Sequence, residues 1–186
     1  KLVTLVTPMD FHAKGNPLGL WTEKLNTSIL TNISGNVSGT VISQLFKTMK
    51  PFQLSREKYR RLENLVNKKE NLDTFFRMEK WLNDGPDLTG TTAREFLINF
   101  YQQNRLHENT LKIGGKPVHL ATIKSPVLNL YATKDHIVPP EATGALSQHI
   151  KPALYQEQAL VGGHIGAFTS LNTQRELIKS LSNWLG

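Results

Sequence analysis

The 186-residue sequence contains 39% hydrophobic and 20% charged residues and no cysteine, which is typical of a globular protein and excludes disulfides and thiolate metal sites. It contains no apolar run of the roughly 20 residues that a membrane-spanning helix needs, and its first residues do not have the pattern of a signal peptide. Much of the net charge of +7 lies in residues 56–69, but no nucleic-acid reader motif accompanies it, so we expect a solvated helix face and no nucleic-acid partner.

The chain begins with KLVTLVTP, an apolar and β-branched run that predicts a buried strand within residues 1–10. Buried parallel strands do not usually begin a domain without a lead-in. We therefore expect the sequence to be the later part of a longer polypeptide, with earlier strands of a sheet missing. Such a sheet exposes an edge and apolar surface, so we also expect poor solubility unless another chain pairs with that edge.

Residues 15–110 have a helical pattern after an irregular start. They include SGTVISQLFKTMKPF, a long segment that ends in FFRMEKWL, and TTAREFLINFYQQNRL. The last of these begins with an expected capping box, Thr92 to Glu95. No strand pattern interrupts the block, so we interpret it as an inserted, mainly helical subdomain.

Residues 111–186 alternate between strand and helix patterns, after a hairpin or extended connector around Gly114 and Gly115. Strand, helix, strand and helix in succession predict parallel crossover units. We therefore expect an α/β fold whose core is formed by residues 1–14 and 111–186. The predicted strands cover 126–132 and 153–161, and the predicted helices cover 139–150 and 172–185.

The last predicted helix has two further features. A capping box is expected at Thr173 and Glu176. Five apolar residues are spaced so that they should form one buried face. They are Leu177, Ile178, Leu181, Trp184 and Leu185.

Two loops that follow the later strands carry an acid and an imidazole. TKDHIVP contains Asp135, and GGHIGAF contains His164. Ligands bind at the carboxyl ends of parallel strands, and neighbouring strands lie about 4.8 Å apart, so we expect these two side chains to meet. An acid that holds one imidazole nitrogen leaves the other free to act as a base toward a nucleophile. The sequence thus predicts a catalytic pair.

Other acids and histidines are weaker candidates. Asp10 also follows a strand and is an alternative acid, whereas His136 is expected to turn inward and brace its loop. The remaining histidines have no second ligand at metal spacing, so we predict structural or solvated roles for them and no metal site. They are His12, His107, His119 and His149.

A nucleophile elbow of the form G-x-S-x-G should precede such an acid and histidine. GNVSG at residues 35–39 is the nearest match, but its middle residue is Val37 and Ser38 comes one place late. No strand pattern precedes it, so we interpret it as a turn. The nucleophile is not in this chain.

A series of motifs resembles the polyhydroxyalkanoate synthases, and most closely their short, two-component class III type. The match is collinear from residue 1 to 186, and KDHIVP and GHIG are its most specific parts. The motifs in chain order are LVTLVTPMDF, GN at 35–36, KPFQL, FRMEKWLNDGPDLTG, FLINFYQQNRL, IGG, VLNLYATKDHIVPP and GGHIGAF.

The resemblance implies a fold, a reaction and roles. These synthases are α/β-hydrolase relatives that use a cysteine to polymerise (R)-3-hydroxyacyl groups from coenzyme A thioesters, releasing coenzyme A. His164 would deprotonate the cysteine, and Asp135 would orient that imidazole and help to activate the 3-hydroxyl of the incoming unit. The helical block would be a cap over the active site, in which packing rather than substrate contact is expected for Trp81, Asp84 and Tyr101.

The resemblance also implies partners and a location. No separate cofactor is expected, because coenzyme A is part of the substrate. The expected partners are a 3-hydroxyacyl-CoA, the polyhydroxyalkanoate chain, an accessory subunit, further copies in a dimer or higher oligomer, and an amino-terminal part with the cysteine. Without that part the chain should be inactive. The expected location is the cytoplasm, at the surface of polyhydroxyalkanoate granules.

Two other functions stay open at this point. One is a fragment of another α/β-hydrolase, such as an esterase, thioesterase or depolymerase, and the other is a non-catalytic cap or scaffold. The upstream elbow distinguishes the two enzymatic functions, because a serine favours hydrolysis and a cysteine favours acyl transfer.

Overall fold

The computed structural model describes residues 1–23, 35–49 and 69–186. The chain forms two compact units, one made of Lys1–Leu25 and Phe96–Gly186 and the other of Asn26–Glu95. Each unit is described by itself below. The insertion predicted over residues 15–110, and its role as a cap, stay predictions.

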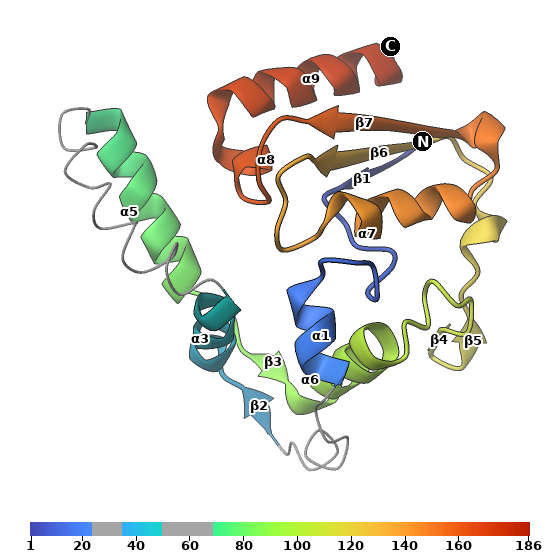
Figure 1. Ribbon diagram of the computed structural model, residues 1–186, viewed down its shortest axis with the longest axis horizontal. Coiled ribbons are helices and arrows are strands. Elements are labelled where there is room, and N and C mark those ends of the chain that lie inside the picture. Colours follow the sequence, from blue (N-terminus) through green and yellow to red (C-terminus); the bar gives the residue numbers. More distant parts are fainter. Residues whose placement is uncertain (24–34, 50–68) are drawn as a thin grey trace. The chain divides into compact units, whose positions relative to one another are not determined.

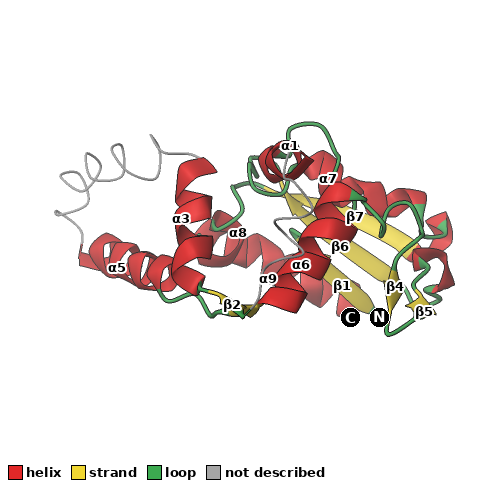
Figure 2. Cartoon of the chain, turned by 90° about the horizontal axis from the view of Figure 1, so that it is seen from below, coloured by secondary structure: helices red, strands yellow, loops and turns green. Residues whose placement is uncertain are grey.

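The first unit contains a parallel sheet of three strands in the order β1-β6-β7 (Figures 1 and 2). The largely apolar composition of β1 and β6 suits a sheet that is covered on its faces. Their register runs from Leu2↔Val127 to Leu5↔Leu130, and β6 continues alongside β7. The predicted α/β class with a parallel sheet is therefore confirmed. The strands are β1 (Leu2–Leu5), β6 (Val127–Ala132) and β7 (Tyr155–Leu160).

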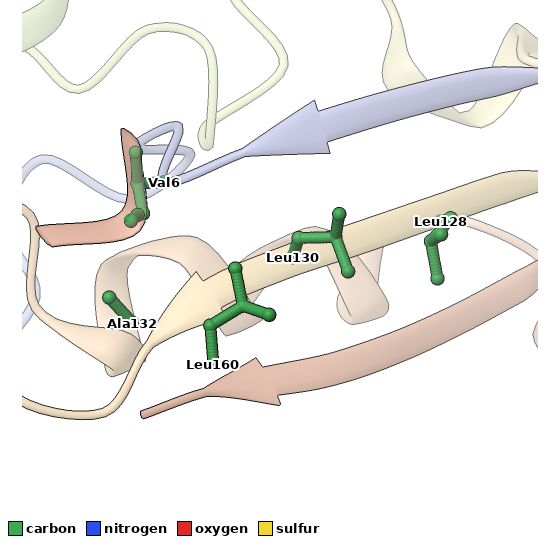
Figure 3. Packing of buried hydrophobic residues seen from close by; sticks show 6 residues of the cluster. Val6, Leu128, Leu130, Ala132 and Leu160 are labelled. Atoms are coloured by element: carbon green, nitrogen blue, oxygen red, sulfur yellow. The ribbon is translucent and has the colours of Figure 1, made fainter. Parts of the chain in front are cut away.

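Helices cover both faces of this sheet, α9 (Leu171–Leu185) on one side and α7 (Pro140–Gly144) on the other (Figure 1). Side chains alternate along β6, so Leu128 and Leu130 face one way and Val127 faces the other. The first face packs with Leu160 in a cluster that α9 covers (Figure 3). The second face packs against the segment that follows α7. Leu130 and Leu160 are fully buried and form the centre of the first cluster.

The helix predicted for residues 139–150 is shorter and tighter than expected. Pro140 begins α7, as the proline rule predicts, and the chain continues as a 3₁₀-helix, η4 (Ala145–Gln148). A second 3₁₀ turn, η5 (Pro152–Leu154), leads into β7. Gly144 at the junction has little helix propensity, which suits a change of helix type there.

Helix α9 begins at Leu171, after an N-cap at Ser170, so the capping box predicted at Thr173 and Glu176 is wrong. Both of those side chains bind the backbone of Val161 instead. The predicted buried face is also only partly correct. Leu177, Leu181 and Trp184 pack against the core, whereas Ile178 and Leu185 are exposed by 63% and 55%.

The rest of the first unit consists of short helices and short strands. Helix α1 (Pro17–Glu23) lies beside the π-helix η2 (Leu97–Gln102). The buried ring of Phe11 contacts Phe96, Phe100 and Tyr101, with ring centroids 4.9 to 6.2 Å apart. The predicted hairpin at Gly114 and Gly115 is confirmed. Its strands are β4 (Lys112–Ile113) and β5 (Lys116–Pro117), and the turn η3 (Leu120–Thr122) follows.

The described part of the second unit is mainly helical, but a short antiparallel strand pair interrupts it, contrary to expectation. GNVSG is part of this pair and not simply a turn, because β2 lies within it and α3 begins at its last glycine. The cap of α6 is Thr89, whose hydroxyl accepts the N–H of Thr92, so the capping box predicted to begin at Thr92 is wrong. The elements are β2 (Asn36–Val37), α3 (Gly39–Met49), α5 (Lys69–Asn83), β3 (Leu88–Thr89) and α6 (Gly90–Phe96).

A fully buried asparagine links the strands of the sheet. Asn129 of β6 accepts a hydrogen bond from the Thr4 hydroxyl of β1 at 2.8 Å. Its amide donates to the Thr143 carbonyl at 3.1 Å and to the Tyr155 hydroxyl of β7 at 3.0 Å. Burial raises the pKa of Tyr155 to about 12. Because every polar atom of Asn129 has a partner, the amide fixes the strand register rather than weakening the core.

Candidate active site

The loops that follow β6 and β7 lie side by side at the carboxyl end of the sheet, where α8 (Gly166–Thr169) also lies (Figure 1). The N–H of Thr133 donates to the carbonyl of Leu160 at 3.0 Å, and the N–H of Lys134 donates to the carbonyl of Gly162 at 2.8 Å. These bonds extend the ladder between the two strands by two residues. They set the distance between the loop that carries Asp135 and the loop that carries His164.

The carboxylate of Asp135 is completely buried, and both of its oxygens accept hydrogen bonds. Oδ1 accepts the backbone N–H groups of Ile137 and Val138 at 2.9 and 2.8 Å. Oδ2 lies 2.8 Å from Nδ1 of His164. The two backbone donors fix the rotation of the carboxylate, so that its second oxygen is aimed at the imidazole.

The imidazole of His164 is held at one nitrogen and open at the other. Since a carboxylate only accepts hydrogen bonds, Nδ1 carries the proton that bonds Asp135, and Nε2 is left as the basic nitrogen. The side chain is 25% exposed, and its ring lies 6.3 Å from the ring of Phe168 in an edge-on arrangement. Among the residues that the structure describes, no hydrogen bond engages Nε2. An oriented, partly accessible base is what activation of a nucleophile requires.

Comparison with known proteins identifies relatives of the whole chain. The chain is 39% identical over 184 residues to the poly(3-hydroxyalkanoate) polymerase subunit PhaC of Thiocystis violacea, covering 99% of this chain and 52% of that protein. The PhaC subunit of Allochromatium vinosum is 38% identical over 184 residues, with the same coverage. That of Synechocystis is 37% identical over 191 residues, covering 99% of this chain and 50% of that protein.

The chain belongs to the PhaC family. This confirms the resemblance predicted from the motifs, and the chain spans about half the length of these curated relatives. No protein-family model matches it. An α/β hydrolase from a Medee basin deep-sea metagenome is similar at a TM-score of 0.42 and 14% identity, covering 98% of this chain and 56% of that one.

The other acid considered in this chain, Asp10, has structural partners. Asp10 accepts hydrogen bonds at Oδ1 from the Asn104 amide at 2.7 Å and from the N–H of His12 at 2.8 Å. These bonds shape the turn after β1. His136 is exposed and does not turn inward to brace its loop, so that prediction is wrong. The structure brings Asp135 to His164, and the catalytic roles of both stay predictions.

The three residues expected in the predicted cap differ in their surroundings. Trp81, expected to pack, is 62% exposed, and Asp84 is also exposed. Tyr101 belongs to the first unit, where it packs against Phe11 and Phe96, and burial raises the pKa of its hydroxyl to about 12.

One groove of the chain lies apart from Asp135 and His164. A groove of about 360 Å³ between β7 and α9 is lined by polar side chains, including Glu157 and Lys179, and by neither Asp135 nor His164. In the described ranges, no three His, Asp or Glu side chains are grouped to hold a metal ion. No helix among the same residues has the length and hydropathy to cross a membrane.

His107 and His149 lie 42 residues apart in the sequence but form a pair in the structure. Nε2 of His149 lies 3.1 Å from Nδ1 of His107, and the amide of Asn109 lies 3.4 Å from the other nitrogen of His149. Desolvation and the electrostatic effect of the nearby His107 lower the pKa of His149, against the opposite effect of Glu108. Of the other histidines, His12 bonds the Tyr101 carbonyl at 2.9 Å and His119 is exposed.

The lowered pKa of His149 predicts a small acid sensitivity of folding. The unfolded state takes up the proton near pH 6.5 and the folded state only at lower pH, so stability is lost as the pH falls through this window. We expect the urea midpoint of the chain to fall less between pH 7.5 and 5.5 in His149→Gln than in the unaltered protein. His119→Gln is the control, and an equal fall in all three proteins would contradict the prediction.

Proposed function

We propose that this chain supplies the acid and the base of a polymerase that transfers (R)-3-hydroxyacyl groups from coenzyme A thioesters to a growing polyester. The observation that carries the proposal is the hydrogen bond of 2.8 Å between Asp135 Oδ2 and His164 Nδ1, with Nε2 open. Support comes from the relatives, which are named poly(3-hydroxyalkanoate) polymerase subunits.

The chain contains no cysteine, so the proposed nucleophile belongs to a part of the polymerase outside these 186 residues. Nε2 of His164 takes the proton of that thiol, and the thiolate attacks the thioester carbonyl. The bond to the coenzyme A sulfur breaks, and coenzyme A leaves as a thiol with the proton from Nε2. The chain alone forms no acyl intermediate in this scheme.

The second half of the proposed cycle uses the same base. Nε2 of His164 accepts the proton of a 3-hydroxyl group, whose oxygen attacks the acyl thioester and forms the new ester bond while the cysteine regains its proton. Throughout, Asp135 holds the imidazole in one tautomer and stabilises the positive charge that forms on it. Both half-reactions begin from the neutral imidazole that carries its proton on Nδ1, and the hydrogen bond to Asp135 favours this tautomer over the one protonated on Nε2.

A chimaera tests the proposed function. The amino-terminal half of the Thiocystis violacea subunit is fused to this chain at the start of the aligned region, and release of coenzyme A from 3-hydroxybutyryl-CoA is measured. We expect release together with polymer, and loss of both in His164→Gln. The matched control is His119→Gln, which changes an exposed histidine and leaves the rate unaltered.

Two outcomes would contradict the proposal. Release of coenzyme A with free 3-hydroxybutyrate and no polymer would favour a hydrolase. A folded chimaera whose rate does not change in His164→Gln would favour a scaffold role for this chain.

A further inference from the structure

Val161, just before the loop that carries His164, is held by two side chains of α9. The carbonyl of Val161 accepts a hydrogen bond from Thr173 Oγ1 at 3.0 Å. The N–H of Val161 donates to Glu176 Oε2 over a longer distance, 3.5 Å. The carbonyls on either side of Val161 bond the loop after β6 instead, so consecutive peptide groups are fixed from opposite sides.

These contacts replace strand pairing. In the part of the sheet that the structure describes, β7 is an outer strand and has a neighbour only in β6. The outward backbone groups at its end would be bonded by water alone without α9. Thr173 is 1% exposed whereas Val161 is exposed, so the bond is covered from the side of the helix and gives a defined position to the end of the strand.

The helix that carries these two side chains is itself firmly seated. Leu177, Leu181 and Trp184 pack against the buried cluster of the sheet. Nζ of Lys1 donates to the carbonyls of Trp184 and Leu185, both at 2.9 Å. The contacts of Thr173 therefore attach the loop to a well-packed helix and not to another loop.

The far side of the loop is anchored as well. The N–H of Ala167 donates to the carbonyl of Gly163 at 3.0 Å, and Ala167 is fully buried in the same cluster. Gly163 passes close to the neighbouring loop, since a Cβ there would lie 3.4 Å from the Lys134 carbonyl. His164 thus lies between two fixed points, Val161 and Ala167.

We propose that Thr173, together with Glu176, is a positioning pair that fixes Val161 and thereby the distance of the His164 imidazole from Asp135. The inference deepens the proposed function and rests on it for its effect on the rate. Neither side chain touches the imidazole, so the expected effect on catalysis is smaller than that of the catalytic pair. A displacement of about 1 Å can lower a rate about 100-fold, and we expect a loss of about 10- to 100-fold in kcat with little change in KM.

The first test does not depend on activity. The proton between His164 Nδ1 and Asp135 gives a separate low-field NMR signal in the ¹⁵N-labelled 186-residue chain, assigned by its loss in His164→Gln. We expect Thr173→Val, which keeps the shape of the side chain and removes its hydroxyl, to broaden or shift this signal. Thr173→Ser keeps the hydroxyl and should restore it. An unchanged signal in Thr173→Val would overturn the proposal.

A matched control separates positioning from general loosening. Thr22 is also buried, and its hydroxyl donates to the Leu18 carbonyl at 2.8 Å. Thr22→Val should leave the His164 signal unaltered, and equal changes in both valine variants would overturn the proposal. Should Thr173→Val not fold, Glu176→Ala decides, because Glu176 is exposed and alanine favours the helix. An unchanged His164 signal in Glu176→Ala would overturn the proposal that the two side chains act as a positioning pair.

The second test uses the chimaera described above. We expect kcat to fall in Thr173→Val and to recover in Thr173→Ser, with KM nearly unchanged in both. If the unaltered chimaera releases no coenzyme A while the NMR signal responds as expected, the proposed function fails and the positioning pair stands. Unchanged kcat in an active Thr173→Val chimaera would overturn the positioning role.

Discussion

Asp135→Asn is expected to lower kcat about 10⁴-fold in the chimaera while leaving the fold intact, by analogy with the loss seen when a triad aspartate becomes asparagine. The backbone N–H groups of Ile137 and Val138 hold the oxygen that asparagine retains, Oδ1. The new NH₂ group would then face His164 and donate to Nδ1. The imidazole proton would move to Nε2, and the base would be lost.

The measurement is the rate of coenzyme A release from 3-hydroxybutyryl-CoA, with the far-ultraviolet circular dichroism spectrum as the check on folding. His136→Asn changes the exposed neighbour and serves as the control, which should keep the full rate. A rate in Asp135→Asn within about tenfold of the unaltered chimaera would remove Asp135 from the proposed catalytic set.

Asn129→Leu is expected to destabilise the chain by about 2–4 kcal/mol although leucine is more apolar. The substitution leaves the Thr143 carbonyl without its amide donor and removes the acceptor of the Thr4 hydroxyl, and each buried polar group left unpaired costs about 1–3 kcal/mol. The branched side chain also has to fit a site that excludes solvent completely.

Urea unfolding followed by circular dichroism measures this effect in the 186-residue chain. Asn172→Leu makes the same chemical change at an exposed position of α9 and should leave the midpoint nearly unaltered. A variant Asn129→Leu as stable as the unaltered chain would show that the network sets the register at no gain in stability, as is known for some buried polar groups.

The positions of the strands and of the acid and the histidine could be predicted from the sequence because they rest on local signals. The apolar run at 126–132 predicted β6, and the proline at 140 predicted the start of α7 but not its end at Gly144. Asp135 and His164 follow directly from strands that proved to be neighbours, and neighbouring parallel strands bring their ends together.

Other features depend on contacts that no local pattern encodes. Thr173 and Glu176 have the spacing of a capping box, but the helix starts two residues before Thr173 and tertiary contact takes both side chains to Val161. Ile178 fits an apolar helix stripe and is nonetheless exposed, because only part of the stripe faces the sheet. His107 and His149 meet only through the fold, so their pairing could not be predicted.

The hydrogen bonds that hold Asp135 and His164 all arise between residues 132 and 176. In the proposed scheme, the groups that transfer protons therefore lie on a different part of the polypeptide from the thiol. In the absence of any sulfur nucleophile, the imidazole can be titrated directly by ¹⁵N NMR, and its tautomer can be measured without acylation competing. The basicity of the His164 imidazole would thus be measured on its own, as a property of one contiguous stretch of chain.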